Sequence, residues 1–340
     1  MSVRASAKAA VLPLLLGACQ YQHYQSDFGG AAVEDRQFLT LFWIFIAVCA
    51  FMYVLVIGFL IAGIARARRV DANIVETGRH HHSNPLMRST LIGWTALIGV
   101  SLAGLAIASF FTDRSMARAA TNQKLSVTVT GNQWWWDIEY NAADASKTLR
   151  TANELHLPVG VPTRIFLNSN DVIHSFWVPS LAGKQDLIPG RKNNITVLPT
   201  RVGVFRGPCA EFCGLQHAHM SLVVVVEPYA DFIKWWDHQL QPAPQPTTPL
   251  ALAGYKYVTT GPCSACHAIG GTPANGQVGP DLTHLASRKS LAAGTMPMGE
   301  GNLYGWVEDP QSLKPGVNMP TIGLEPGQLH AVVAYLETLK

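Results

Sequence analysis

Residues 209–220 concentrate side chains that can hold a soft metal ion: the thiols of Cys209 and Cys213, the imidazole of His217 and the thioether of Met220. Thiolate, thioether and imidazole donors suit copper or zinc much better than magnesium or calcium. The thioether favours copper, because it is a poor ligand for zinc and a familiar weak ligand in copper electron-transfer sites. The Cys-x3-Cys spacing also lets both sulfurs face one centre, where each thiolate can bridge two metal ions.

Two simpler interpretations of this segment stay open from the residues alone. Two Cys and two His side chains satisfy a single tetrahedral zinc ion, which would make residues 209–220 a zinc-stapled loop. Alternatively, Cys209 and Cys213 form a disulfide. The sequence therefore indicates a metal loop, with copper as the preferred ion.

A second motif with its own chemistry is Cys263-Ser-Ala-Cys266-His267. In a C-x-x-C-H motif both thiols add to the vinyl groups of a haem, and the adjacent His becomes the proximal iron ligand. A C-x-x-C pair by itself can also be redox-active or bind zinc. The His directly after it, in a chain with the features of an exported protein, favours a c-type haem.

The composition indicates a membrane protein that carries cofactors. Only 14% of the 340 residues are charged, against about 25% in a typical soluble protein. The net charge of +3 is too small to argue for nucleic acid as a partner. Of the six cysteines, Cys19 lies at a processing site, Cys49 lies in an apolar run and the other four belong to the two motifs. No pair is left for a structural disulfide.

The first third of the chain has the pattern of a signal followed by a membrane hairpin. Two basic residues and the apolar stretch 9–16 outline a secretory signal, and Leu16-Gly-Ala-Cys19 resembles a bacterial lipobox with Cys19 as the lipidated first residue. Residues 37–65 and 89–112 carry no charge, and about 20 apolar residues are enough to cross a bilayer. The Arg-rich loop between them marks the cytoplasmic side. Both ends of the hairpin are therefore expected outside, with membrane lipid around the helices.

After residue 121 the apolar pattern becomes alternating, which indicates β-strands. Short strands at this spacing predict an antiparallel sandwich, and the metal loop then lies between two late strands. Trp134, Trp135 and Trp136 cannot all face inward, because successive side chains of a strand point to opposite faces. At least one of them is expected to be exposed or at an interface. The expected strands are 125–130, 134–140, 164–167, 195–198 and 222–226.

A short amphipathic helix is expected at 229–240, followed by a Pro-rich spacer, which will be extended and semi-rigid. The last domain then opens with a helix, carries the C-x-x-C-H motif and closes with a helix that has one apolar face.

Together, the motifs resemble subunit II of haem–copper cytochrome c oxidases, in the caa-type form with a cytochrome c domain fused to its C-terminus. The spacing C-x-E-x-C-x3-H-x2-M matches the binuclear copper (CuA) loop of that family at every ligand position. The resemblance implies one more copper ligand, His174, and coordination through the backbone carbonyl of Glu211. It also implies that the Glu211 side chain helps to bind a magnesium ion shared with subunit I. Trp134 corresponds to the residue where electrons enter.

For the last domain, the resemblance to small c-type cytochromes implies a distal Met or His ligand to the haem iron. Met319, in an irregular loop before the final helix, is the preferred residue. Met296 and Met298 compete for the role, with His284 and His330 as outsiders. A Met/His pair raises the reduction potential of the iron, as a relay to copper requires.

The resemblance also implies the function. Electrons from an external donor, such as a cytochrome c or a quinol–cytochrome c reductase complex, would reach the fused haem, then the copper pair, then subunit I. Subunit I reduces oxygen to water, coupled to proton translocation, so this chain is the electron-accepting subunit of an enzyme complex in the bacterial inner membrane. The chain itself gives proton pumping no support, because it has no acidic residue between Glu76 and Asp113, where family members commonly carry a Glu. The alternative is a membrane-anchored electron carrier with the same cofactors outside any oxygen-reducing complex.

The predicted fold is a multidomain membrane protein with a two-helix transmembrane hairpin, an all-β cupredoxin-like sandwich and an all-α cytochrome c domain. The predicted boundaries are 1–18 for the signal peptide, 19–36 for a periplasmic tail, 37–65 and 89–112 for the membrane helices, 66–88 for the cytoplasmic loop, 113–240 for the CuA domain, 241–250 for the linker and 251–340 for the cytochrome c domain.

Overall fold

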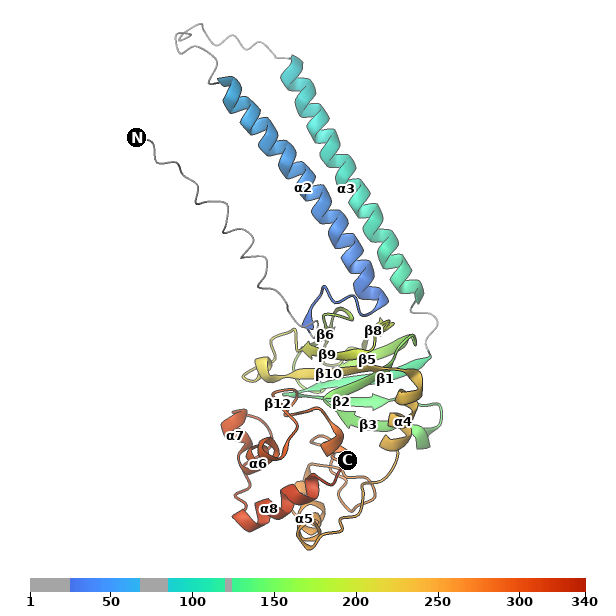
Figure 1. Cartoon of the computed structure of the whole chain (residues 1–340), viewed down its shortest axis with the longest axis vertical. Coiled ribbons are helices and arrows are strands. Elements are labelled where there is room, and N and C mark those ends of the chain that lie inside the picture. Colours follow the sequence, from blue (N-terminus) through green and yellow to red (C-terminus); the bar gives the residue numbers. More distant parts are fainter. Residues whose placement is uncertain (1–24, 68–84, 120–123) are drawn as a thin grey trace, which may run out of the picture. The chain divides into compact units, whose positions relative to one another are not determined.

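The computed structural model describes residues 25–67, 85–119 and 124–340, which divide into two units (Figure 1). One unit contains the two long helices, within residues 36–121, and the other contains residues 122–340 together with the segment that ends at Asp35. The predicted signal, the proposed lipid site at Cys19 and most of the predicted cytoplasmic loop lie outside the described residues.

The two long helices are α2 (Val33–Ala67) and α3 (Pro85–Ala119). Both are long and apolar enough to cross a membrane, by length and composition. Their apolar side chains point outward, as at Val54 and Val100, which are 67% and 72% exposed. The helices touch where the rings of Phe59 and Trp94 meet edge to face, with centroids 5.9 Å apart. Each helix extends beyond the uncharged run that predicted it. Such a run marks only the apolar part of the helix, and the helical backbone hydrogen bonds continue into the charged residues on either side.

The second unit begins with a β-sandwich. One sheet has the strand order β3-β2-β1-β5-β8, a second has the order β4-β10-β9, and β6 pairs with β7. A single core cluster contains residues of both larger sheets, so the sheets pack face to face. The strands are β1 (Leu125–Asn132), β2 (Trp135–Tyr140), β3 (Leu149–Ala152), β4 (Glu154–Pro158), β5 (Thr163–Ser169), β6 (His174–Val178), β7 (Ala182–Leu187), β8 (Asn193–Val197), β9 (Gly203–Pro208) and β10 (Ser221–Glu227), with a 3₁₀ turn, η2, at Ala145–Lys147.

Alternation along the strands builds the core as predicted. In β1, Val127 and Val129 are fully buried, whereas Thr128 between them is partly exposed. β10, the middle strand of its sheet, is buried from Ser221 to Val226. A strand covered on both faces carries a continuous apolar run instead of an alternating one. This rigid strand carries the C-terminal end of the metal loop.

The prediction of an antiparallel sandwich is wrong for two strand pairs. β1 runs parallel to β5, with Val127 opposite Ile165, and β10 runs parallel to β4, with Val224 opposite Leu155. Alternation along one strand shows which side chains face inward, but it carries no information on the direction of the partner strand. That direction is set by the connection between the strands.

The chain then passes through α4 (Tyr229–Gln239) and the Pro-rich spacer to α5 (Pro249–Thr260). The hydroxyl of Thr248 caps α5 by accepting a hydrogen bond from the Ala251 amide at 3.2 Å. The spacer packs on the last domain: Ala243 is 4% exposed and its amide donates to the carbonyl of Gly270 at 2.9 Å. It is therefore anchored along part of its length.

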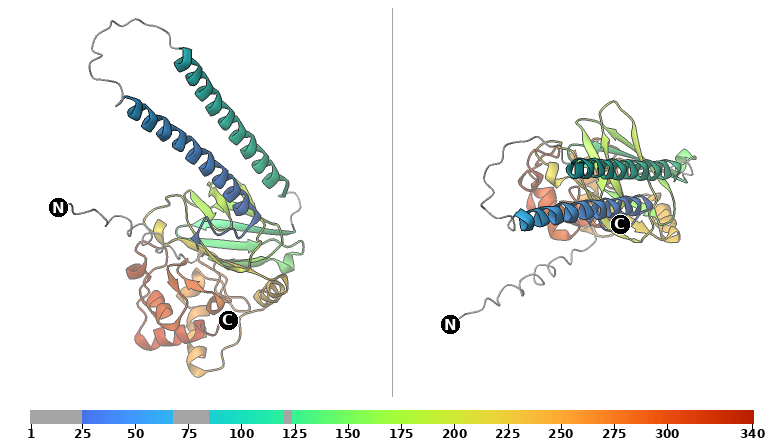
Figure 2. Two further views of the ribbon diagram at one scale, coloured as in Figure 1. Left: turned by 45° about the horizontal axis from the view of Figure 1, so that its top comes forward. Right: turned by 90° about the horizontal axis from the view of Figure 1, so that it is seen from above.

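The last domain is helical (Figure 2), and its buried side chains form a core of their own. α5 crosses the final helix at Gly254, where a Cβ atom would lie 1.9 Å from the carbonyl oxygen of Ala331. Only glycine allows the two helices to approach so closely. The elements after α5 are η4 (Pro262–Ala265), η5 (Leu285–Ser287), β11 (Ser290–Leu291), β12 (Met296–Pro297), α6 (Glu300–Glu308), α7 (Pro310–Leu313) and α8 (Pro326–Leu336). The structure thus confirms the predicted fold class.

Candidate functional site

The predicted copper loop, residues 209–220, joins β9 to β10 and includes a short 3₁₀ turn, η3 (His217–His219). The Cys209 amide closes the base of the loop by donating to the Met220 carbonyl at 2.8 Å. Within the loop, Cys213 Sγ lies 3.8 Å from Cys209 Sγ and 3.6 Å from His217 Nδ1. It also lies 3.9 Å from Met220 Sδ. The carbonyl oxygen of Glu211 lies 3.3 Å from Cys209 Sγ. The donor atoms of the loop therefore gather around the two cysteine sulfurs.

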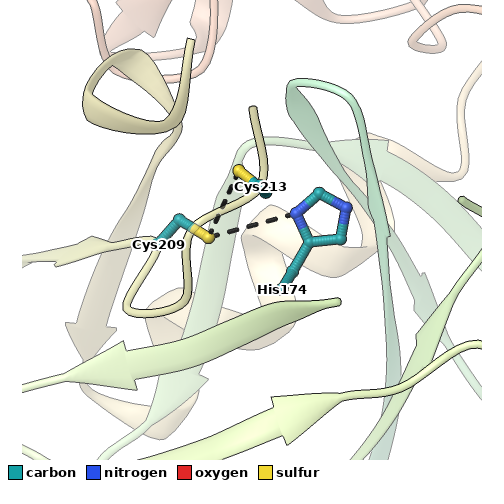
Figure 3. Close-up of side chains that lie close together, drawn as sticks. All are labelled: His174, Cys209 and Cys213. Atoms are coloured by element: carbon teal, nitrogen blue, oxygen red, sulfur yellow. Dashed lines mark hydrogen bonds between the residues drawn. The ribbon is translucent and has the colours of Figure 1, made fainter. Parts of the chain in front are cut away.

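His174, the predicted ligand from outside the loop, is the first residue of β6 and points toward the two thiols (Figure 3). Its Nδ1 lies 4.0 Å from Cys209 Sγ, and its ring is fully buried. Its Nε2 lies 2.7 Å from Asp171 Oδ1. A carboxylate that accepts the far N–H of an imidazole fixes both the tautomer and the ring orientation of a metal ligand. Asp171 therefore turns Nδ1 toward the sulfur atoms.

Gly131 of β1 makes room for this imidazole. A Cβ atom at Gly131 would lie 2.6 Å from Cδ2 of His174. The ring is thus packed against backbone on one side and held by a carboxylate on the other. Such support limits movement of the ligand.

The two thiols shift each other's pKa in opposite directions. Hydrogen bonding to Cys213 lowers the pKa of the Cys209 thiol to about 3, against the effect of burial and with a contribution from His174. The same contact and burial raise the pKa of the Cys213 thiol far above its ordinary value. The second proton must therefore leave when metal binds, because the thiolate is the ligand form.

The donor set fits a pair of copper ions better than the simpler alternatives. The loop and His174 offer five side-chain donors and one carbonyl, whereas a structural zinc ion takes four ligands. One imidazole stands beside each sulfur, His174 next to Cys209 and His217 next to Cys213. The 3.8 Å between the sulfurs is much longer than a disulfide bond of about 2.05 Å. Two ions bridged by both thiolates would use every donor.

The three adjacent tryptophans occupy different environments. Trp136 is 1% exposed and its ring centroid lies 6.0 Å from that of His174. The Trp134 indole Nε1 donates to the Cys213 carbonyl at 2.8 Å, and the side-chain amide of Gln133 donates to the same oxygen at 2.8 Å. Trp134 and Trp135 line a cavity shared with the last domain. This confirms the expectation that part of the segment lies at an interface.

The C-x-x-C-H motif lines that same cavity through Cys263, Cys266 and His267. His267 Nδ1 lies 2.7 Å from the Pro280 carbonyl oxygen, so Nδ1 carries the proton and Nε2 is left for a metal. Burial lowers the pKa of His267, which favours the neutral form that binds iron. A Cβ at Gly279 would lie 2.7 Å from the His267 ring. We call this space the haem cavity.

Met319 also lines the haem cavity, in the irregular segment between α7 and α8. The side-chain amide of Gln311 holds this segment by donating to the carbonyl oxygens of Val317 and Met319, at 2.8 and 2.7 Å. Met296 and Met298 instead pack against the core of the domain and are not among the residues that line the cavity.

The two histidines considered as distal ligands have other partners. The two ring nitrogens of His284 lie 3.0 and 3.1 Å from the carbonyl oxygens of Lys340 and Gln241. The ring of His330 contacts the Tyr304 hydroxyl on the surface. Of the five candidate ligands, the geometry therefore favours Met319.

The Glu211 side chain pairs with a lysine at the surface. Its carboxylate is partly exposed and lies 3.8 Å from the ammonium of Lys184. His219 is turned toward the Gln216 side chain, with Nδ1 2.7 Å from Oε1. The loop thus presents one carboxylate to its surroundings and keeps its sulfur donors inside.

Asp171 and Lys314 both contact the site, although nothing in the sequence alone indicates a role for either residue. Asp171 lies three positions before His174 in the chain, so its carboxylate was a possible hydrogen-bond acceptor for that imidazole. Lys314 is 1% exposed, and its ammonium donates to carbonyl oxygens of the sandwich and of the last domain. Lys314 precedes Pro315 and Gly316, and nothing in this segment of the sequence indicates that its side chain is buried between two domains.

Two family models match the chain. Residues 142–227 match cytochrome c oxidase subunit II, periplasmic domain, and residues 251–340 match cytochrome c. Membership of these families implies CuA copper in the first domain and haem c in the second.

Whole-chain relatives carry the same name. A cytochrome c oxidase subunit 2 from Alkalihalophilus pseudofirmus is 31% identical over 301 residues, covering 87% of this chain and 85% of the relative. The subunit 2 of Bacillus subtilis is 27% identical over 350 residues, covering 97% and 96%. Among solved structures, the periplasmic domain of subunit II of cytochrome oxidase from Bradyrhizobium japonicum is 28% identical, with a TM-score of 0.33, over 35% of this chain and 96% of that one. The similarity runs through the hairpin, the sandwich and the last domain, and the chain belongs to the cytochrome c oxidase subunit II family, with a cytochrome c domain at its C-terminus.

Proposed function

We propose that this chain carries electrons from its own haem c to a binuclear CuA centre and on to subunit I, which reduces oxygen to water and translocates protons. One observation carries the proposal. Trp134 forms part of the wall of the haem cavity, and its indole donates a hydrogen bond to the backbone of the copper ligand Cys213. The two cofactor sites thus meet at a single buried side chain.

The proposed CuA ligands are two bridging thiolates, two imidazoles, a thioether and a carbonyl oxygen. Bound there, the copper pair would accept and donate one electron at a time. The chain keeps the ligands buried and braced, which limits rearrangement when the charge changes. The residues are His174, Cys209, Glu211 through its carbonyl, Cys213, His217 and Met220.

The proposed haem ligands are the thiols of Cys263 and Cys266, the imidazole of His267 and the thioether of Met319. His267 is oriented by the Pro280 carbonyl, and Met319 is held by Gln311. Because the haem domain is covalently attached, it does not need to reach the copper site by diffusion. The attachment raises the effective concentration of the haem at the copper site.

The exposed carboxylate of Glu211 supports a magnesium site shared with subunit I, with Lys184 as its present partner. The helices α2 and α3 would anchor the chain in the inner membrane, with both cofactor domains on the periplasmic side and Cys19 lipidated. An external cytochrome c or a quinol–cytochrome c reductase complex would supply the electrons.

Affinity purification of the tagged chain from its native membrane tests this function. We expect an oxygen-reducing subunit to copurify, and oxygen uptake to follow reduction of the fused haem. Recovery of the loaded chain without such a subunit would support the membrane-anchored electron carrier instead.

A further inference from the structure

A buried lysine of the haem domain reaches into the sandwich beside both cofactor sites. The ammonium Nζ of Lys314 donates to the carbonyl oxygens of Trp134 at 2.8 Å and His219 at 2.7 Å, both in the sandwich. Its third bond, at 2.9 Å, goes to Ala292 of its own domain. An ammonium has three N–H donors, and here each has an acceptor.

The three acceptors explain how the ammonium of Lys314 can be buried at this position. Moving an ammonium out of water is costly, and burial lowers the pKa of Lys314 to about 7. Complete hydrogen bonding offsets this cost, because bonds from a charged donor are stronger than neutral ones. An aliphatic side chain would fill the space but leave three carbonyl groups without this donor.

Two of the acceptors of Lys314 are backbone groups that adjoin the proposed electron path. The Trp134 carbonyl belongs to the residue whose indole contacts Cys213, and His219 precedes the ligand Met220 in the copper loop. Lys314 also begins the segment that leads to Met319. One ammonium therefore joins the copper loop, the tryptophan and the loop of the distal haem ligand.

Other bonds across this interface provide reporters of docking. The Ser221 amide donates to the Ala293 carbonyl at 2.8 Å, and the Lys289 amide donates to the Glu154 carboxylate at 2.8 Å. The Gln216 side chain donates to the Pro315 carbonyl at 2.7 Å. Each of these bonds links the sandwich to the haem domain, so each opens when the domains separate.

We propose that Lys314 is a positioning residue that holds the haem domain against Trp134 and the copper loop, so that electron transfer between the two cofactors depends on it. The inference rests on the proposed function for the identity of the cofactors. The docking itself is a property of this chain and is measurable by itself.

The test compares Lys314→Met, which removes all three donors, with Lys314→Gln, whose amide retains two N–H donors. Lys256→Met is the matched control, because Lys256 is an exposed lysine on α5 of the same domain. Hydrogen exchange is measured in the purified complex, on peptides that contain the Ser221 and Lys289 amides. We expect exchange at these amides to accelerate at least about tenfold in Lys314→Met, less in Lys314→Gln, and not in the control.

A kinetic comparison separates positioning from a general structural role. Copper is reduced either through the fused haem or directly by a small ruthenium ammine complex. Positioning predicts that the Lys314 variants slow only the first route. Equal slowing of both routes, or exchange that matches the Lys256→Met control, would overturn the proposal.

The two proposals fail in different ways. A native protein without copper or covalent haem would refute the proposed function. Unchanged exchange and unchanged internal transfer in a protein loaded with both cofactors would refute the role of Lys314 alone. If Lys314→Met does not accumulate, the same exchange and kinetic measurements are made on Lys314→Gln and compared with Lys256→Met.

Discussion

The indole nitrogen of Trp134 lies 2.8 Å from the carbonyl oxygen of Cys213, although the two residues are 79 positions apart in the chain. Trp134 is only 8% exposed, and it lines the cavity that the sandwich shares with the last domain. On the proposed function, the side chain that receives electrons therefore already faces the domain that carries its donor. A separate cytochrome would have to deliver electrons to the fused haem.

Replacing Trp134 by Phe keeps an aromatic ring but removes the hydrogen bond to Cys213. We expect electron transfer from the fused haem to copper to slow severalfold, while copper binding persists. Stability should fall by only about 1 kcal/mol, because Gln133 still donates to the same carbonyl. Flash photolysis measures the internal step. Trp135→Phe leaves this bond in place and serves as the control; equal rates in both variants would argue against Trp134 as the bridge.

Replacing Asp171 by Asn weakens the support of His174. An amide side chain retains one acceptor oxygen, whereas both carboxylate oxygens of Asp171 are used here. One accepts from the imidazole of His174, and the other accepts from the backbone amide of Gln133 at 2.6 Å. We expect copper affinity to fall by roughly 10–100-fold, as for other partners of metal-bound imidazoles. Competition with a copper chelator measures the affinity. Asp231→Asn, at an exposed ion pair on α4, should leave it unchanged.

Replacing Met319 by Ala should leave the haem covalently attached and remove its distal ligand. The iron is then expected to become high-spin or to lose reduction potential, since a Met ligand raises it. Optical spectra and a redox titration detect both effects. Met298→Ala is the control, and a spectral change in that variant alone would move the distal ligand to Met298.

A buried histidine of β4, which belongs to neither proposed ligand set, predicts a pH dependence of stability. His156 lies between two carboxylates, 3.1 Å from Glu154 Oε1 and 2.8 Å from Glu227 Oε1, and stacks on Trp235 at 4.1 Å. Burial lowers the pKa of His156, but the hydrogen bonds to the two carboxylates and their negative charges together raise it by more, so the net shift is upward. A raised pKa in the folded state means that folding favours the protonated ring.

This contribution is complete below the ordinary pKa of about 6.5 and disappears as the pH rises through the raised value. His156→Gln should therefore lower the melting temperature most at acidic pH, and the difference from the native chain should shrink on going to alkaline pH. Thermal unfolding of the full chain over a pH series tests this. A difference that grows with pH would contradict the assignment of the charge to His156.

The copper loop and the haem motif were predictable because their ligands lie close together in sequence. Cys209 to Met220 form one connection between neighbouring strands, and the spacing of the donors alone indicates a shared centre. The membrane helices were predictable for a similar reason, since a long uncharged run is a local signal. His174 could be identified only by resemblance, because nothing in its own segment points to residues some 35 positions later.

Features that depend on distant backbone could not be predicted. Lys314 acts through carbonyl groups as far as 180 positions away, and a backbone carbonyl leaves no mark in the sequence. The cluster around His156 joins β4, β10 and α4, which only the folded chain brings together. The two parallel strand pairs were missed because local alternation does not encode the direction of a partner.

On the proposed function, Cys209 and Cys213 bridge a copper pair next to a covalent haem. Metal analysis of the anaerobically purified chain, combined with electron paramagnetic resonance and an optical spectrum, tests this assignment. We expect a pair of coppers with a mixed-valence signal and a c-type haem in every chain. A single zinc ion, or a disulfide between the two cysteines, would contradict it.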